Sequence, residues 1–200
     1  MDFEEPSPPP VDYLPRDALM IKTVIAGPFA VGKTTFVSAV SETRSLHTEE
    51  RMTEAGALID DLAGVNEKTA TTVGTDFGRL TLDSHLVLYL FGSPGQRRFR
   101  LLWEDIARGA LGVLVLVDTR RLDSAFEVMD MVEDSGLPYA VAVNRFPGAP
   151  EHSLEDVRRS LDLSADTPLL SLDARSKDEC LDALIALTEY VLDRSPMEVT

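Results

Sequence analysis

The sequence predicts an α/β fold in which a mostly parallel sheet is covered by helices on both faces. Short apolar runs alternate with helical patterns along most of the chain, and a glycine-rich turn lies between the first apolar run and the first helical pattern. Such alternation is typical of parallel sheets, because each crossover needs a helix-length connection. We therefore expect a ligand site at the carboxyl ends of the strands.

Six apolar runs have the length and composition of strands. Two of them are separated by only a few residues, which is too short for a crossover helix, so this pair is expected to be an antiparallel hairpin. The sequence therefore predicts a six-stranded sheet with one antiparallel strand. The predicted strands are Leu19–Ala26, Leu80–Leu82, Leu86–Phe91, Leu111–Val117, Tyr139–Val143 and Leu169–Leu172.

Five segments between or after these strands carry helical patterns. One of them is preceded by a capping-box pattern, in which Ser153 is followed three residues later by Asp156. The predicted helices are Lys33–Ser41, Leu101–Arg108, Ser124–Glu133, Leu154–Leu161 and Asp178–Leu192.

Composition indicates one domain and a reducing compartment. Residues 1–17 are acidic and rich in proline, which predicts a disordered tail before a single domain at 18–195. The formal net charge of −15 argues against a nucleic-acid partner. Cys180 is the only cysteine, which excludes an internal disulfide.

No apolar run is long enough to span a membrane. We therefore expect a cytoplasmic protein without direct membrane insertion, which is recruited to a membrane only through a partner.

The strongest signal is a phosphate-binding loop. The segment Gly27-Pro-Phe-Ala-Val-Gly32-Lys33-Thr34 matches the P-loop pattern, follows an apolar strand and opens a helix. Backbone N–H groups of such a loop point into one concavity, the lysine adds charge, and the threonine hydroxyl is a ligand for Mg²⁺. The expected nucleotide contacts in this segment are Gly27, Phe29, Ala30, Val31, Gly32, Lys33, Thr34 and Thr35.

Further motifs resemble those of Ras-like small GTPases. The segment 72–77 resembles switch I of Rab-like members, 95–100 resembles switch II, and two loops resemble the base-binding loops. More narrowly, 91–96 and the Asp-Ala-Arg loop look like the bacterial Ras-like proteins of actinobacterial conservon operons, which are related to gliding-motility polarity GTPases. The residues expected at the base are Asn144, Arg145, Asp173, Ala174 and Arg175.

This resemblance implies a P-loop NTPase fold of the Ras-like type, GTP or GDP with Mg²⁺, and slow GTP hydrolysis by a molecular switch. Lys33 would hold the terminal phosphates, Thr34 and Thr72 would ligate Mg²⁺, the Gly95 amide would meet the terminal phosphate, and Gln96 would orient the attacking water. Hydrolysis would then release two loops that bind a partner protein. For the family that partner is a Roadblock-type regulator.

Four departures from the family pattern bear on activity. Gly92 stands where an acid usually supports Mg²⁺, and Pro147 stands where an aspartate usually reads guanine. Phe29 fills a position where small residues leave room for an activator's arginine finger, which predicts slow turnover unless Arg97 or Arg98 acts in cis. The stretch 42–71 is longer than usual and lacks periodicity.

Several alternatives stay open at this point. Gly92 and Pro147 favour a nucleotide-binding pseudo-GTPase scaffold, and a P-loop ATPase with relaxed base specificity fits the same loop. Thr72 could be only a strand entry. Trp103 could pack in the core or meet a partner.

Overall fold

The computed structural model describes residues 18–43, 46–51, 72–93 and 100–194, and for 46–51, 72–74 and 100–101 the backbone alone. Seven strands of this part form one sheet in the order β2-β3-β4-β1-β5-β6-β7. The strands are β1 (Leu19–Ala26), β2 (Leu46–Arg51), β3 (Thr72–Asp83), β4 (Leu86–Gly92), β5 (Gly112–Val117), β6 (Tyr139–Asn144) and β7 (Leu169–Leu172). The helices are α1 (Lys33–Val40), α2 (Arg100–Ala107), η3 (Thr119–Ala125), α3 (Phe126–Asp134), α4 (Leu154–Ser160) and α5 (Lys177–Arg194).

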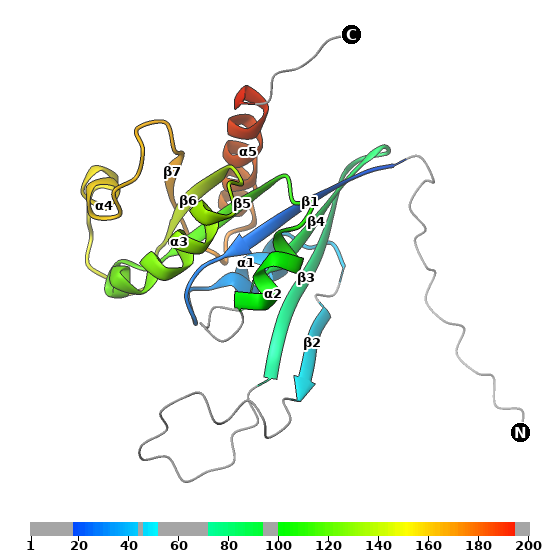
Figure 1. Ribbon diagram of the computed structural model, residues 1–200, viewed down its shortest axis with the longest axis horizontal. Coiled ribbons are helices and arrows are strands. Elements are labelled where there is room, and N and C mark those ends of the chain that lie inside the picture. Colours follow the sequence, from blue (N-terminus) through cyan, green and yellow to red (C-terminus); the bar gives the residue numbers. More distant parts are fainter. Residues whose placement is uncertain (1–17, 44–45, 52–71, 94–99, 195–200) are drawn as a thin grey trace, which may run out of the picture.

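Helices cover both faces of the sheet and give three layers (Figure 1). Helices α1 and α5 pack on one face, where α5 buries residues at helical spacing such as Cys180, Ala183, Leu184 and Leu187. Helices α2, α3 and α4 pack on the other face around Trp103, Val128 and Val157. Strand β5 lies between them and is buried along its whole length, as its apolar sequence requires. None of the described helices combines the length and apolar character needed to cross a bilayer.

The predicted α/β fold, with a mostly parallel sheet and one antiparallel strand, is confirmed. Strand β3 runs antiparallel to both β2 and β4, and the pairs β1–β4, β1–β5, β5–β6 and β6–β7 are parallel. Strands β1 and β7 have the predicted bounds. The predicted cap of α4 is also present, since Ser153 Oγ accepts the Asp156 N–H at 3.1 Å.

Three element predictions were wrong in detail. No strand was predicted in the stretch after α1, but it contributes β2 at the sheet edge, where strands are often polar. Strand β3 begins at Thr72, eight residues before the predicted start. The helix predicted over 124–133 is α3, which begins at Phe126, because the first two predicted positions, Ser124 and Ala125, belong to η3.

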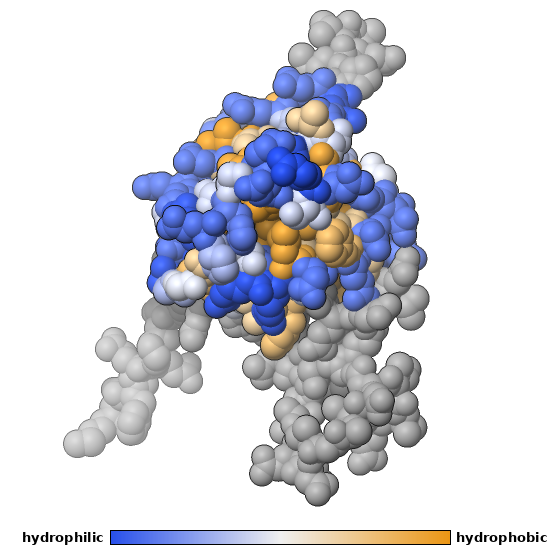
Figure 2. All heavy atoms as spheres, turned by 90° about the vertical axis from the view of Figure 1, so that its left-hand side faces the viewer, coloured by the Kyte–Doolittle hydropathy of each residue, from blue (hydrophilic) through white to orange (hydrophobic). Residues whose placement is uncertain are grey.

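The surface on the side of α3 and α4 is mostly hydrophilic, with a small apolar area within it (Figure 2). Phe126 on α3 and Leu154 on α4 are among the large apolar side chains that stay partly exposed. Trp103 is only 5% exposed, so of its two predicted roles the structure favours packing in the core. Its indole Nε1 has no hydrogen-bond partner among the described residues.

The close packing of α1 on β3 depends on Gly78. A Cβ atom at this position would lie 2.7 Å from Val37 Cγ1 and 3.2 Å from Ser41 Cβ, and Val37 is fully buried. We expect Gly78→Val to lower the free energy of unfolding by about 2 kcal/mol, as over-packing of a core does. Urea denaturation followed by circular dichroism measures this change.

The pair Gly78 and Val37 offers an internal control. Val37→Ala removes the methyl groups that the new side chain would meet, so the double variant should lose less stability than the sum of the two single variants. Additive losses would show that the clash with Val37 is not the cause.

Candidate functional site

Several loops meet at the carboxyl ends of the parallel strands, as the fold class predicts. The phosphate loop follows β1, Ser93 follows β4, Asp118 follows β5, Asn144 ends β6 and Asp173 follows β7. These segments are far apart in sequence, and the parallel pairing of their strands brings them to one edge of the sheet (Figure 1).

The phosphate loop has the conformation that its glycines allow. Gly32 has a φ of 106°, a left-handed value that favours glycine, and a Cβ atom there would lie 2.5 Å from Asn144 Nδ2. Ala30 also has a positive φ of 61°. Helix α1 begins at Lys33 without a side-chain cap, so its first N–H groups are open toward the loop.

Lys33 contacts the carbonyl groups at the start of the phosphate loop. Its Nζ donates to the Gly27 and Pro28 carbonyls, each at 2.7 Å. Burial lowers the pKa of Lys33 to about 8, and the nearby Asp76 carboxylate opposes this shift. The ammonium group therefore lies at the loop, held by neutral carbonyls that an anion could replace.

Asp76 supplies an acid that the sequence prediction missed. Thr34 Oγ1 donates to Asp76 Oδ2 at 2.6 Å, and Asp76 is buried. Asp76 lies opposite Gly92 in the β3–β4 register, where a Cβ atom on Gly92 would come within 2.9 Å of Asp76 Cβ. The carboxylate thus fills the side of the hairpin where Gly92 carries no side chain. The signal available in the sequence was an acidic residue in a strand, paired with a glycine.

These two oxygen donors fit a hard divalent cation. Mg²⁺ prefers oxygen ligands and is held by one or two protein groups together with phosphate oxygens and water. The Thr34 hydroxyl and the Asp76 carboxylate are such groups, and they already lie in contact. When bound, Mg²⁺ would neutralise negative charge on the phosphates. Thr72, the other predicted ligand, is the first residue of β3, and Gly95 and Gln96 lie outside the described residues.

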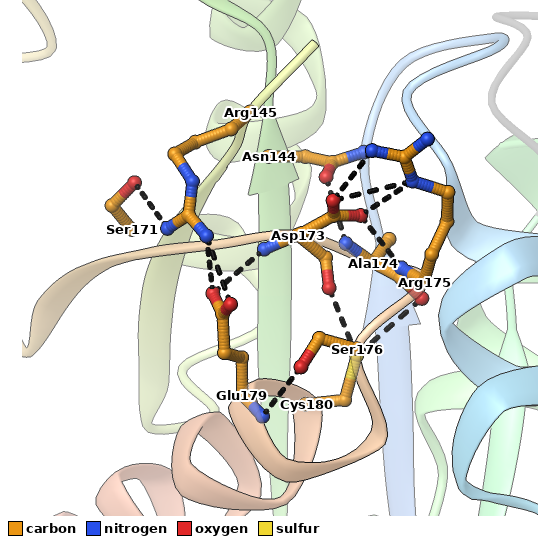
Figure 3. Close-up of polar contacts among 9 residues, drawn as sticks. All are labelled: Asn144, Arg145, Ser171, Asp173, Ala174, Arg175, Ser176, Glu179 and Cys180. Atoms are coloured by element: carbon orange, nitrogen blue, oxygen red, sulfur yellow. Dashed lines mark hydrogen bonds and ion pairs between the residues drawn. The ribbon is translucent and has the colours of Figure 1, made fainter.

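Asn144 joins the phosphate loop to the loop after β7. Its Nδ2 donates to the Val31 carbonyl at 2.9 Å, and its Oδ1 accepts the Ala174 N–H at 3.0 Å. Because Asn144 is buried, both ends of its amide need these partners. Asn144 and Ala174, which were predicted to lie together, do so (Figure 3).

Charged side chains brace the loop after β7 (Figure 3). Arg145 donates to both oxygens of Glu179, and Glu179 also accepts the Asp173 N–H at 2.9 Å. Asp173 accepts four hydrogen bonds from the backbone N–H, Nε and Nη2 of Arg175, which lower the pKa of Asp173 to about 2. Arg145 and Arg175 were predicted to lie at the base, and in this structure both guanidinium groups are engaged with carboxylates. Phe29 and Thr35 are exposed.

The pKa of Lys33 leads to a pH prediction. Phosphate binding favours the charged lysine and so raises its pKa above about 8, which means that the complex holds more protons than the free protein above that pH. Nucleotide affinity should therefore fall as pH rises from about 8, by up to about tenfold per pH unit. Titration calorimetry in buffers of different ionisation enthalpy should detect proton uptake on binding.

Lys33→Arg is the matched control for this prediction. A guanidinium stays charged throughout this range, so the variant should show no comparable proton uptake, whatever its affinity. Equal pH dependence in the two proteins would assign the effect to the ligand or to another group.

Comparisons with known proteins agree with this fold. The chain resembles the Arl6 (BBS3) small GTPase of Trypanosoma brucei, solved with the nucleotide analogue GppNp, with a TM-score of 0.60 and 19% identity over 88% of this chain and 100% of that one. It resembles the FeoB G-domain of Methanococcus jannaschii with a TM-score of 0.54 and 16% identity, over 87% and 99%. The match to the cytosolic domain of T. maritima FeoB in its GDP form has a TM-score of 0.58 and 15% identity and covers 88% of this chain but only 65% of that one.

Sequence comparison gives a relative and a family. The chain is 28% identical over 127 residues to the uncharacterised protein MJ1339 of Methanocaldococcus jannaschii, which covers 62% of this chain and 70% of that protein. A family model described as conserved hypothetical ATP binding protein matches residues 25–194, from the end of β1 to the end of α5. The fold is therefore that of the P-loop GTPases, and the chain belongs to the family of conserved hypothetical ATP binding proteins.

Proposed function

We propose that this protein is a nucleotide-dependent switch that binds GTP or GDP with Mg²⁺ and hydrolyses GTP slowly. The observation that carries the proposal is the phosphate loop, in which Lys33 lies at the loop carbonyls and Thr34 contacts the Asp76 carboxylate. A lysine, a hydroxyl and a carboxylate in this arrangement suit phosphoryl transfer, where catalysis depends on positioning and on neutralising charge.

Guanine is the base that the site supports best. The Ala174 N–H and the Asn144 amide lie together beside the phosphate loop, in the two loops that resemble the base-binding loops of Ras-like GTPases. The structural neighbours include a small GTPase with GppNp and a FeoB domain in a GDP form, which supports the same choice. Pro147 offers neither the carboxylate nor an N–H that could read the guanine edge, so we expect weaker discrimination against adenine.

ATP is the second candidate, because the family is described as ATP binding and Pro147 removes the usual guanine contact. A pseudo-GTPase scaffold is the third, favoured by Gly92 and Pro147. The presence of Asp76 opposite Gly92 weakens that third candidate, since a carboxylate is available at the hydroxyl of Thr34 after all.

The switch itself involves residues whose side chains are not described. We infer that Thr72 and Gly95 contact the terminal phosphate site and that Gln96 orients water, so that hydrolysis releases both segments. A protein partner, of which a Roadblock-type regulator is one, would bind these segments in the cytoplasm or bring the protein to a membrane. Phe29, exposed on the phosphate loop, supports slow turnover because its ring occupies the approach of an inserted arginine.

Calorimetric titration of nucleotide-free protein with GTP, GDP and ATP tests the proposal, each with and without Mg²⁺. We expect Kd values in the micromolar range or tighter for the guanine nucleotides, weaker binding of ATP, and loss of both in Lys33→Ala. Preference for ATP would favour the second candidate. Absence of binding would contradict the proposal.

The acid on β3 gives a sharper test. Asp76→Ala should abolish most of the Mg²⁺-dependent gain in nucleotide affinity, because the carboxylate next to Thr34 is lost. The double variant Asp76→Gly with Gly92→Asp moves the carboxylate to the partner strand of the hairpin. This double variant should recover part of the Mg²⁺-dependent increase in nucleotide affinity. Calorimetry with and without Mg²⁺ measures both.

Asp83→Ala, on the same strand but at the far end of the hairpin, is the matched control and should behave like the original protein. If Asp76→Ala kept the full response to Mg²⁺, the carboxylate would have no part in the metal site.

A further inference from the structure

Arg121 reaches the phosphate loop from a segment that no motif singled out. It lies in η3, directly after β5, and its Nη2 donates to the Phe29 carbonyl at 3.1 Å across 92 positions of sequence. The backbone at Arg121 is not helical, with φ −149° and ψ 53°. Its side chain therefore points in a different direction from the one that a helical residue at this position would have.

Three other arginines in the described part of the site are paired with acids. Arg120 pairs with Asp118 at 2.7 Å, Arg145 with Glu179 at 2.7 Å and Arg175 with Asp173 at 2.6 Å. Within the described residues Arg121 has no ion pair at such a distance, and its hydrogen bond goes to a backbone carbonyl instead. The Asp118 carboxylate interacts electrostatically with Arg121 but is paired with Arg120, so the guanidinium of Arg121 stays at the phosphate loop.

The bond to Phe29 fixes the direction of a peptide group. The C=O of Phe29 and the N–H of Ala30 belong to one trans peptide, so they point to opposite sides. A carbonyl held toward Arg121 therefore turns the Ala30 N–H away from Arg121. This hydrogen bond stabilises an unfavourable backbone conformation, because Ala30 has a positive φ, which an alanine seldom adopts.

Side chains hold most carbonyls of this loop. Lys33 holds those of Gly27 and Pro28, Asn144 holds that of Val31, and Arg121 holds that of Phe29. A bound phosphate draws the ammonium of Lys33 toward itself. Arg121 and Asn144 then remain as the side chains that keep the peptide groups oriented.

The segment that carries Arg121 is itself anchored on the base side of the site. The Arg120 guanidinium lies 3.8 Å from the centre of the Phe146 ring, and Thr119 Oγ1 donates to the Pro150 carbonyl at 3.2 Å. Residues 118–121 therefore connect the loop after β6 to the phosphate loop. Phe146 and Pro150 belong to the same loop as Pro147, so this loop anchors the segment that carries Arg121.

We propose that Arg121 is a positioning residue for nucleotide phosphates, acting through the Phe29–Ala30 peptide. It keeps the Ala30 N–H directed into the phosphate concavity, and the contacts of Arg120 and Thr119 hold it in place. This role rests on the proposed function, because it assumes that the loop binds a nucleotide.

The test compares Arg121→Ala with Arg121→Lys, using Arg159→Ala as control. Arg159 is exposed on α4 and pairs with Asp156, away from the phosphate loop. Calorimetry with GTP and GDP should show about a tenfold loss of affinity in Arg121→Ala, which is what one charge-assisted hydrogen bond contributes. Arg121→Lys should recover part of it, because an ammonium can donate to the same carbonyl.

A second measurement separates positioning from a direct charge effect. Amide resonances of residues 29–32 in nitrogen-15-labelled, nucleotide-free protein should shift in Arg121→Ala, return toward the original positions in Arg121→Lys, and stay unchanged in Arg159→Ala. A loss of affinity without any change at the Ala30 amide would overturn the positioning role and leave only charge. Unchanged affinity in Arg121→Ala would overturn it as well.

The two proposals fail in different ways. If the original protein binds no nucleotide, the proposed function fails, and the amide resonances of the nucleotide-free protein still decide whether Arg121 orders the loop. If the original protein binds nucleotide and Arg121→Ala matches it in affinity, only the role of Arg121 fails.

Discussion

The buried amide of Asn144 ties together the segments on which the candidate site depends. Its two ends bind the Val31 carbonyl of the phosphate loop and the Ala174 N–H of the loop after β7, and a buried amide that lost either partner would cost free energy. Gly32 approaches so closely that any side chain there would collide with this amide. The shape of the phosphate loop, the end of β6 and the turn before α5 are therefore set together.

The position of the acid follows from the geometry of a hairpin. In the β3–β4 register Asp76 and Gly92 are direct partners, so only one of the two positions has room for a carboxylate. In the sequence, Gly92 stands where an acidic residue was expected. In the sheet, the missing side chain of Gly92 leaves the space through which the Asp76 carboxylate contacts Thr34. The departure at Gly92 is thus accompanied by a carboxylate on the neighbouring strand, within hydrogen-bond distance of Thr34.

The sequence was informative where one local pattern decides the structure. Apolar periodicity located β1, β7 and α5, and the glycines with Lys33 and Thr34 located the phosphate loop. It failed where pairing across the sheet or between loops decides. Strand β2 has few apolar residues and depends on its pairing with β3. The position of Asp76 depends on Gly92, which lies sixteen residues away on the partner strand. The role that we propose for Arg121 depends on its contact with Phe29 in the phosphate loop. Such contacts have no local signature, because they arise only once the sheet has formed.

Charge pairing explains how an acidic protein can present a site for an anion. The chain carries a formal net charge of −15, which disfavours phosphates at long range. At the site, Asp118, Asp173 and Glu179 are each bound to an arginine, so these acids are neutralised where they would otherwise repel a ligand. Lys33 and Arg121 instead direct their charge at loop carbonyls, which are neutral. These two cations lie close to the loop, and salt screens distant acids more than close charges, so the phosphate site that we propose depends on the loop more than on the net charge.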